Sequence, residues 1–183
     1  MTAPIKLAVE GQLEFEFQAG WKAIKWDDDV AYRDGLARCS DAKAIDLLAT
    51  NGDGVPHLIE VKDPRGHWTE YRHATPTDEL AELVAAKVRD TIAGLVYAKD
   101  RVATDHVLVH LKSLVQGRTS RPWVILWLEG AEVDQVLATT LKGLIEKKLS
   151  WLKPKVQVTS RKLWKEGLPG LTVRSLAGAP WQG

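Results

Sequence analysis

Asp46, Glu60 and Lys62 are the residues of this chain whose types and spacing could do chemistry together. Asp46 stands in an apolar run, Ala44–Ala49, and the other two stand in a second one, His57–Asp63. Burying a charged side chain costs free energy unless something compensates its charge. A divalent cation would do so, because the two carboxylates offer the hard oxygen ligands that such ions prefer, with the lysine beside the reacting group.

The Gly/Asn/Asp-rich segment between the two runs predicts a β-hairpin. Side chains alternate along a strand, so Glu60 and Lys62 share one face. A three-residue loop, Gly52–Gly54, places Asp46 directly across from Glu60, with the two Cβ atoms roughly 5 Å apart. A two-residue turn would place Asp46 opposite Val61 and would put the apolar sets on opposite sides. The pattern therefore favours the three-residue loop and both carboxylates on one face.

Two facing carboxylates repel each other and take up protons more readily unless a cation lies between them. Magnesium suits such a pair, because it binds one or two carboxylates at about 2.1 Å and keeps positions for water and phosphate oxygens. It would lower the pKa of a bound water and polarise a phosphorus centre. Lys62 would orient or deprotonate the attacking water, or offset charge in the transition state.

This arrangement resembles the PD-(D/E)XK nuclease superfamily, which includes many restriction endonucleases and Holliday-junction resolvases, and it looks like an uncharacterised bacterial branch of that group. Glu60-Val61-Lys62 matches the (D/E)XK motif, and Ile45 stands where the family usually has a proline, at a position that varies within the group. The resemblance implies hydrolysis of phosphodiester bonds in DNA. It also implies Mg²⁺, or Mn²⁺, held by Asp46, Glu60 and the backbone carbonyl of Val61.

Lys87 is a fourth candidate catalytic residue. It falls on the apolar stripe of a predicted helix, seven residues after Leu80. From there it can reach over the sheet to the metal site or to phosphate. The alternative is a lysine whose stem packs while its ammonium group extends to water.

The order of elements predicts a mixed β-sheet flanked by helices, α/β or α+β in class, as the resemblance to restriction endonucleases also implies. Besides the hairpin, the patterns predict strands at Leu13–Phe17, Trp21–Trp26, Val107–Leu111 and Trp123–Leu128, edge strands at Lys155–Thr159 and Leu171–Ser175, and helices from about Thr75 to Lys99 and from Val133 to Leu149.

Composition indicates one domain over residues 1–183, located in the cytoplasm. The chain has one cysteine, Cys39, which excludes an internal disulfide, and it shows no signal pattern and no membrane-spanning run. Residues 142–183 carry nine Lys/Arg and several tryptophans against two acids, a net +7, whereas the rest carries a net −6. A basic end beside an acidic metal site suits binding and hydrolysis of a phosphate backbone.

Several weaker candidates share a charged or aromatic character without a decisive spacing. They are Asp27–Asp29 and one of Glu10, Glu14 and Glu16 as further metal ligands, a loop at Arg65–His73, the segments Trp151–Lys155 and Arg161–Lys165, and Arg118 and Arg121 as DNA contacts, and His57 as a phosphate contact. His106 and His110, taken as residues of a strand, lie about 13 Å apart and would not share an ion.

We therefore expect a magnesium-dependent nuclease that acts on DNA, with no membrane partner. A catalytically inactive module of the same fold, binding nucleic acid or a protein through the basic region 142–183, is the alternative. A toxin, immunity or defence component that associates with proteins is a third interpretation. Assembly as a homodimer stays open.

Overall fold

The structure is a computed structural model, and it describes residues 3–9, 13–39, 41–65, 67–99, 105–116, 121–130, 132–164 and 168–176. Its elements, in chain order, are β1 (Ile5–Val9), β2 (Leu13–Phe17), β3 (Lys22–Lys25), α1 (Val30–Arg33), the short 3₁₀ helix η1 (Leu36–Arg38), β4 (Leu47–Thr50), β5 (Pro56–Lys62), α2 (Trp68–Ala74), α3 (Thr77–Ala98), α4 (Asp105–Gln116), β6 (Trp123–Leu128), α5 (Gln135–Lys148), β7 (Lys155–Thr159) and β8 (Leu171–Ser175).

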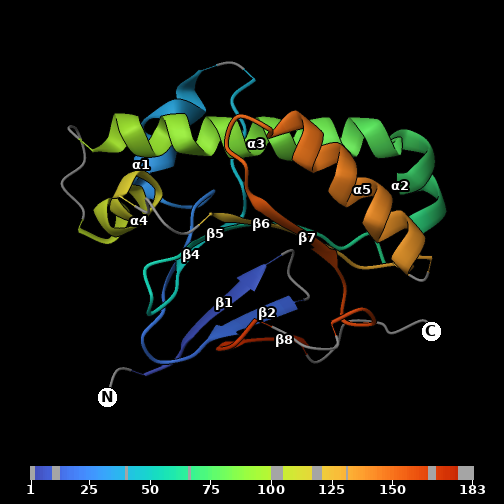
Figure 1. Ribbon diagram of the computed structural model, residues 1–183, viewed down its shortest axis with the longest axis horizontal. Helices are drawn as coiled ribbons and strands as arrows, with labels where there is room; N and C mark the ends of the chain where they lie inside the picture. The colour runs from blue at the N-terminus through green and yellow to red at the C-terminus, as the bar shows by residue number, and fades with distance from the viewer. Residues whose placement is uncertain are drawn as a thin grey trace.

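The described strands form two sheets in a mixed α/β architecture. The larger sheet has the order β3-β4-β5-β6-β7, antiparallel up to β5 and parallel from β5 to β7. Parallel neighbours need long connections, and helices supply them here: α2, α3 and α4 lie between β5 and β6, and α5 lies between β6 and β7. Helices cover one face of this sheet, and the antiparallel sheet β1-β2-β8 lies on the other side (Figure 1).

Alternation along the strands divides the core between these two faces. Leu48 and Leu58 pack with α3, α4 and α5, whereas Leu47 and Ile59 pack with the apolar residues of the small sheet. On that second face the ring of Phe15 meets the edge of Trp127 with 5.4 Å between centroids. Burial on both faces explains why the central strands are almost continuously apolar in sequence.

The hairpin of β4 and β5 has the predicted register. Leu47 pairs with Ile59 and Thr50 with Pro56, so one further residue in this register places Asp46 opposite Glu60. The amide of Asn51 donates to the carbonyl of Val55, which leaves a loop of three residues. Gly54 ends that loop with φ +77°, the left-handed conformation that glycine adopts without steric cost.

Most predicted elements are confirmed, and three predictions are wrong. Val107–Leu111 lies within α4 rather than in a strand, because its buried Val107 and Leu111 are one helical turn apart. The segment 65–73, expected as a loop, contains most of α2. The expectation of a single mixed sheet is also wrong: Leu13–Phe17 and Leu171–Ser175 are strands, as predicted, but they form a separate sheet with β1, for which no strand was predicted.

The edge-strand predictions are confirmed, since β7 ends the larger sheet and β8 ends the smaller one. The long helix predicted to begin after Pro76 is α3, and the helix predicted from Val133 is α5. No helix in the described part of the chain has the length and apolar character that crossing a bilayer requires.

Candidate active site

The candidate residues lie at one end of the inner strands β4 and β5 of the five-stranded sheet, on the face that the helices cover. Asp46 comes directly before β4, and Glu60 and Lys62 occupy the end of β5. Glu60 shares the face of Leu58, which packs against the helices, because the two residues are two positions apart on one strand. The hairpin therefore presents all three charged groups toward α3.

The structure brings the four predicted side chains together. The ammonium groups of Lys62 and Lys87 lie 2.8 Å and 2.7 Å from Glu60 Oε1. Lys87 Nζ also lies 3.8 Å from Asp46 Oδ1, and the amide of Val61 donates to Asp46 Oδ2 at 2.6 Å. The interpretation in which Lys87 reaches over the sheet is thus the one that the geometry shows.

Helix α3 delivers Lys87 because it runs across the strand ends. Lys87 contacts Glu60 of β5, and one turn later the hydroxyl of Thr91 accepts a hydrogen bond from the amide of Ile45, just before Asp46. Near its end, Gly94 faces the Trp26 ring, where an added Cβ would lie 3.1 Å from Cζ2. The helix thus fixes the position of Lys87 relative to Asp46.

Glu60 is the most perturbed acidic group of the site. Its side chain is 1% exposed, and burial, followed by the charge of Asp46, raises its pKa to about 7, while the two lysines oppose the shift. Glu60 Oε2 is buried without a hydrogen-bond partner in the described part of the chain. A carboxyl group whose pKa is raised toward neutral pH by burial, and which lies beside charged groups, is frequent in functional sites.

The three aspartates after β3 have different surroundings. Asp27 is the member nearest the site in electrostatic terms: burial raises its pKa, Asp46 adds to the rise, and Lys25 and Lys87 oppose it. Its Oδ1 atom is buried and lacks a hydrogen-bond partner among the described residues. Asp28 pairs with Lys25 at 2.7 Å.

Asp29 has a structural position. Its carboxylate accepts from the amide of Ala31 and so caps α1, and it lies 2.8 Å from His106 Nε2. His110, four residues further along α4, contacts Thr50 instead, with 2.9 Å between Nδ1 and Oγ1. The two histidines therefore have separate partners, although the distance given above for a strand does not apply to them on a helix.

The site offers oxygen ligands to a hard cation. Glu60 Oε2 has no hydrogen-bond partner among the described residues, and Asp46 Oδ1 lies 3.8 Å from the Lys87 ammonium group. The carbonyl of Lys62 accepts from Glu129 on the β6 side, so the preceding carbonyl, that of Val61, is directed to the Asp46 side. Within the described ranges no group of three or more His, Cys, Asp or Glu is placed to hold a metal. Magnesium needs only one or two carboxylates, so these residues fit it.

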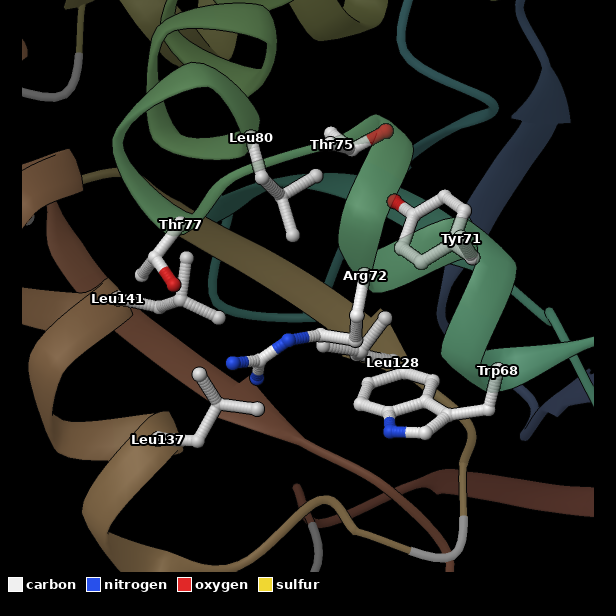
Figure 2. A pocket seen from close by; sticks show the side chains of 9 residues that line it. All are labelled: Trp68, Tyr71, Arg72, Thr75, Thr77, Leu80, Leu128, Leu137 and Leu141. Carbon is white, nitrogen blue, oxygen red and sulfur yellow. The ribbon is translucent and has the colours of Figure 1, made fainter.

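A small pocket adjoins the site under α2. Leu128, the neighbour of Lys62 on β6, contributes to its lining, together with residues of α2, of α5 and of the start of α3 (Figure 2). Trp68 and Arg72 of α2 lie at the pocket, with the Arg72 Cζ atom 5.9 Å from the centroid of the Trp68 ring. The sequence pattern had indicated these residues only as a basic and aromatic loop.

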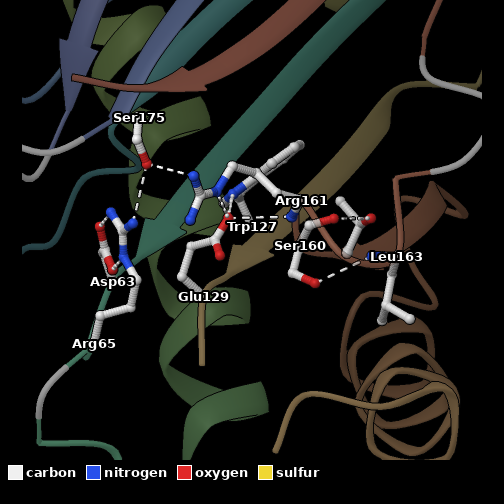
Figure 3. Close-up of polar contacts among 9 residues, drawn as sticks. Asp63, Arg65, Trp127, Glu129, Ser160, Arg161, Leu163 and Ser175 are labelled. Atoms are coloured by element: carbon white, nitrogen blue, oxygen red, sulfur yellow. Dashed lines mark hydrogen bonds and ion pairs between the residues drawn. The ribbon is translucent and has the colours of Figure 1, made fainter. Parts of the chain in front are cut away.

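A polar network lies behind the strand ends, on the face of the small sheet (Figure 3). Glu129 is 6% exposed, and its Oε1 accepts from the Trp127 indole at 2.9 Å and from Arg161 Nε at 3.2 Å. The guanidinium of Arg161 also donates to Ser175 Oγ, which Arg65 Nη1 reaches at 3.0 Å. Sequence reasoning missed Glu129, although a charged residue directly after a buried strand was a signal for it.

The remaining predicted candidates lie away from the site. Glu14 and Glu16 pair with Arg174 on the small sheet, and Glu10 and Arg118 lie outside the described residues. His57 is buried, and burial lowers its pKa to about 4.

The basic C-terminal region is divided between the two ends of the strands of the larger sheet. The exposed Trp151 comes before β7. Since β7 starts beside Trp123 and runs parallel to β6 and β5, Trp151 lies at the end of the strands opposite the site. Arg161 comes after β7, at the same end of the strands as the site, but it pairs with Glu129. Trp164 packs on Trp127, with 5.1 Å between ring centroids.

Comparisons of this chain with protein-family models, with curated proteins and with solved structures found no match. The geometry of the site is therefore what indicates a function for this chain.

Proposed function

We propose that this chain is a metal-dependent nuclease of the PD-(D/E)XK superfamily, with a restriction-endonuclease-like fold, that hydrolyses phosphodiester bonds in DNA. The observation that carries the proposal is the convergence of Asp46, Glu60, Lys62 and Lys87 on one face of the sheet, where β4 begins and β5 ends. The mixed sheet, with its acidic hairpin followed by a helix across the strand ends, supports the family assignment.

A purely structural role explains this cluster poorly. Taking charged groups out of water costs several kcal/mol per ion, and a buried ion pair often stabilises a fold no more than apolar residues of equal volume would. Glu60 is in addition left with a buried, unpartnered oxygen and a pKa raised to about 7. Such an arrangement is typical of a site that takes up a ligand.

Asp46, Glu60 and the carbonyl of Val61 are the groups that would hold Mg²⁺ or Mn²⁺. The ion, when bound, would supply Lewis acidity and a more acidic water. Glu60 must give up its proton to serve as a ligand, and the two lysines favour this because they stabilise its ionised form.

Lys62 and Lys87 supply the chain's own positive charge at the site. Both reach Glu60, so each ammonium group is held beside the position at which a phosphate would meet the carboxylates. Lys62, at the open end of the strand, orients the attacking water or accepts its proton. Lys87, which α3 holds over the helix-covered face of the sheet, offsets negative charge that develops on the phosphate oxygens.

The alternative, a catalytically inactive binding module, receives less support. It relies on the basic and aromatic residues of the C-terminal region, yet Arg161 is paired with Glu129 and Trp164 is packed on Trp127. Arg161 and Trp164 therefore hold the fold together, and the exposed lysines of the region, such as Lys153 and Lys155, lie before or at the start of β7, away from the candidate site.

The test combines metal titration with cleavage. Calorimetry with Mn²⁺ should show binding to the wild type that is lost when Asp46→Ala and Glu60→Ala are combined. Cleavage of single- and double-stranded DNA in Mg²⁺ should fall by roughly 100-fold or more in Lys62→Ala, the scale of lost acid–base catalysis. Lys112→Ala, at an exposed lysine of α4, is the matched control. Full activity of Lys62→Ala would overturn the assignment.

A further inference from the structure

The pocket under α2 lies one strand away from the candidate active site. Leu128 pairs with Lys62 in the parallel register of β5 and β6, and neighbouring strands are about 4.8 Å apart. Both side chains point to the helix-covered face. Leucines make up much of the lining, namely Leu80, Leu128, Leu137 and Leu141. A substrate bound at Lys62 would therefore have an apolar recess directly beside it.

Trp68 gives this recess an aromatic wall with an unused donor. Its side chain is 8% exposed, and its indole Nε1 is buried with no hydrogen-bond partner in the described part of the chain. The ring lies against Gly130, where an added Cβ would come within 2.4 Å of Trp68 Cε3. An indole donor that is buried without an acceptor points to a ligand that supplies one.

Arg72 gives the recess an exposed positive charge. Its side chain is exposed and extends across the pocket from α2 toward the leucines of α5, and its Cζ atom lies 5.9 Å from the centroid of the Trp68 ring (Figure 2). Within the described residues it has no carboxylate partner. A guanidinium group without a carboxylate partner can pair with a phosphate and can leave the indole face at little cost.

The size of the pocket limits what it can take. Its volume is about 210 Å³, including the part open to solvent. Sites that enclose a whole small ligand measure roughly 300–1,000 Å³. The enclosed part holds about one water molecule, so a larger group must enter as Arg72 moves aside. One flat ring of a longer, anionic chain fits these conditions.

We infer that this pocket receives an unpaired nucleobase of single-stranded DNA next to the phosphate held at Lys62. The base stacks on Trp68 in place of the Arg72 guanidinium, an oxygen of the adjoining nucleotide accepts from the indole Nε1, whose N–H lies in the plane of the ring, and Arg72 pairs with the adjoining phosphate. A base within a duplex is paired and stacked and cannot enter. The inference rests on the proposed function, because it takes the phosphate position from the Asp46 and Glu60 site.

The experiment measures binding without cleavage. A fluorescent single strand of about a dozen nucleotides is titrated in EDTA against the wild type, Arg72→Gln and Trp68→Leu. Loss of one stacked base weakens binding by roughly fivefold or more, so both variants should show at least that loss. Arg89→Gln, at an exposed arginine of α3 that pairs with Glu82, should bind as the wild type does.

Abasic oligonucleotides identify the contact. Removing the base at one position should weaken the wild type by a similar factor and Trp68→Leu very little further, since both changes delete the same contact. Arg72 is exposed, so Arg72→Gln keeps the experiment decisive if Trp68→Leu fails to fold.

The possible failures are distinct. Unchanged affinity in Arg72→Gln, or independent effects of Trp68→Leu and the abasic position, would overturn the pocket inference while metal-dependent cleavage stood. A wild type that binds no oligonucleotide would overturn the pocket inference. A wild type that neither cleaves DNA nor binds Mn²⁺ would overturn the proposed function itself.

Discussion

Glu60→Gln should make the protein more stable in alkaline than in mildly acidic buffer, relative to the wild type. The folded carboxyl group has a pKa of about 7 against 4.5 in the unfolded chain. The folded protein therefore keeps a proton that the unfolded chain releases between these two values. Wild-type stability from this group is fully present below the lower value and is lost as pH rises through the upper one.

The size of the effect follows from the same two values. From about pH 5.5 to about pH 8 the wild type should lose about 2 kcal/mol of unfolding free energy that Glu60→Gln keeps, because glutamine resembles the protonated carboxyl group at every pH. His57 and His110 work in the opposite direction, since burial lowers the pKa of each to about 4 and their contribution is lost in acid. Both histidines are present in both proteins, so the difference between the proteins isolates Glu60.

Urea unfolding of the two proteins in EDTA at several pH values measures this difference. A gap that stays constant across the range would refute the reasoning, because Glu60 would then not hold a proton in the folded state. Added Mg²⁺ should stabilise the wild type more at the alkaline end, where the carboxylate is ionised, and should do little for Glu60→Gln.

Two further predictions concern the lysine over the site and the network behind it. Lys87→Met should raise the affinity for Mn²⁺ at alkaline pH by about fivefold, because its ammonium group, 2.7 Å from Glu60, competes with the metal; calorimetry that shows weaker binding would contradict this. Glu129→Ala should lower the unfolding free energy by about 2–4 kcal/mol, since it removes the acceptor of the Trp127 indole and of the Arg161 guanidinium. An unchanged denaturation midpoint would contradict that account.

Local patterns were sufficient to predict the candidate site. Asp46 and Glu60 stand out as charged residues inside apolar runs, and the strand period places them on a common face, so the register of β4 and β5 follows from the sequence pattern. Lys87 was detectable because a lysine on an apolar helical stripe needs a partner, and Glu60 is that partner.

The rest of the arrangement depends on contacts that leave no local trace. A five-residue apolar run such as Val107–Leu111 suits a strand or a helix equally, and only its packing selects the helix α4. The strand pattern of Leu13–Phe17 was clear, but alternation does not say which sheet a strand joins. Arg65 and Ser175 meet across 110 positions of sequence, and no periodicity connects them.

The small sheet joins strands from opposite ends of the described chain, which has a consequence for how the protein forms. β8 pairs with β2, and its Leu171 helps to cover Ile125 and Trp127 on the face of the larger sheet that carries no helices. A chain emerging from the ribosome can assemble the hairpin and α3 long before β8 appears, with one edge of β2 still open. The candidate site is therefore early in synthesis order, and the last strand of the cover on the opposite face is late. Until β8 pairs, chaperones would meet this protein at the open edge of β2.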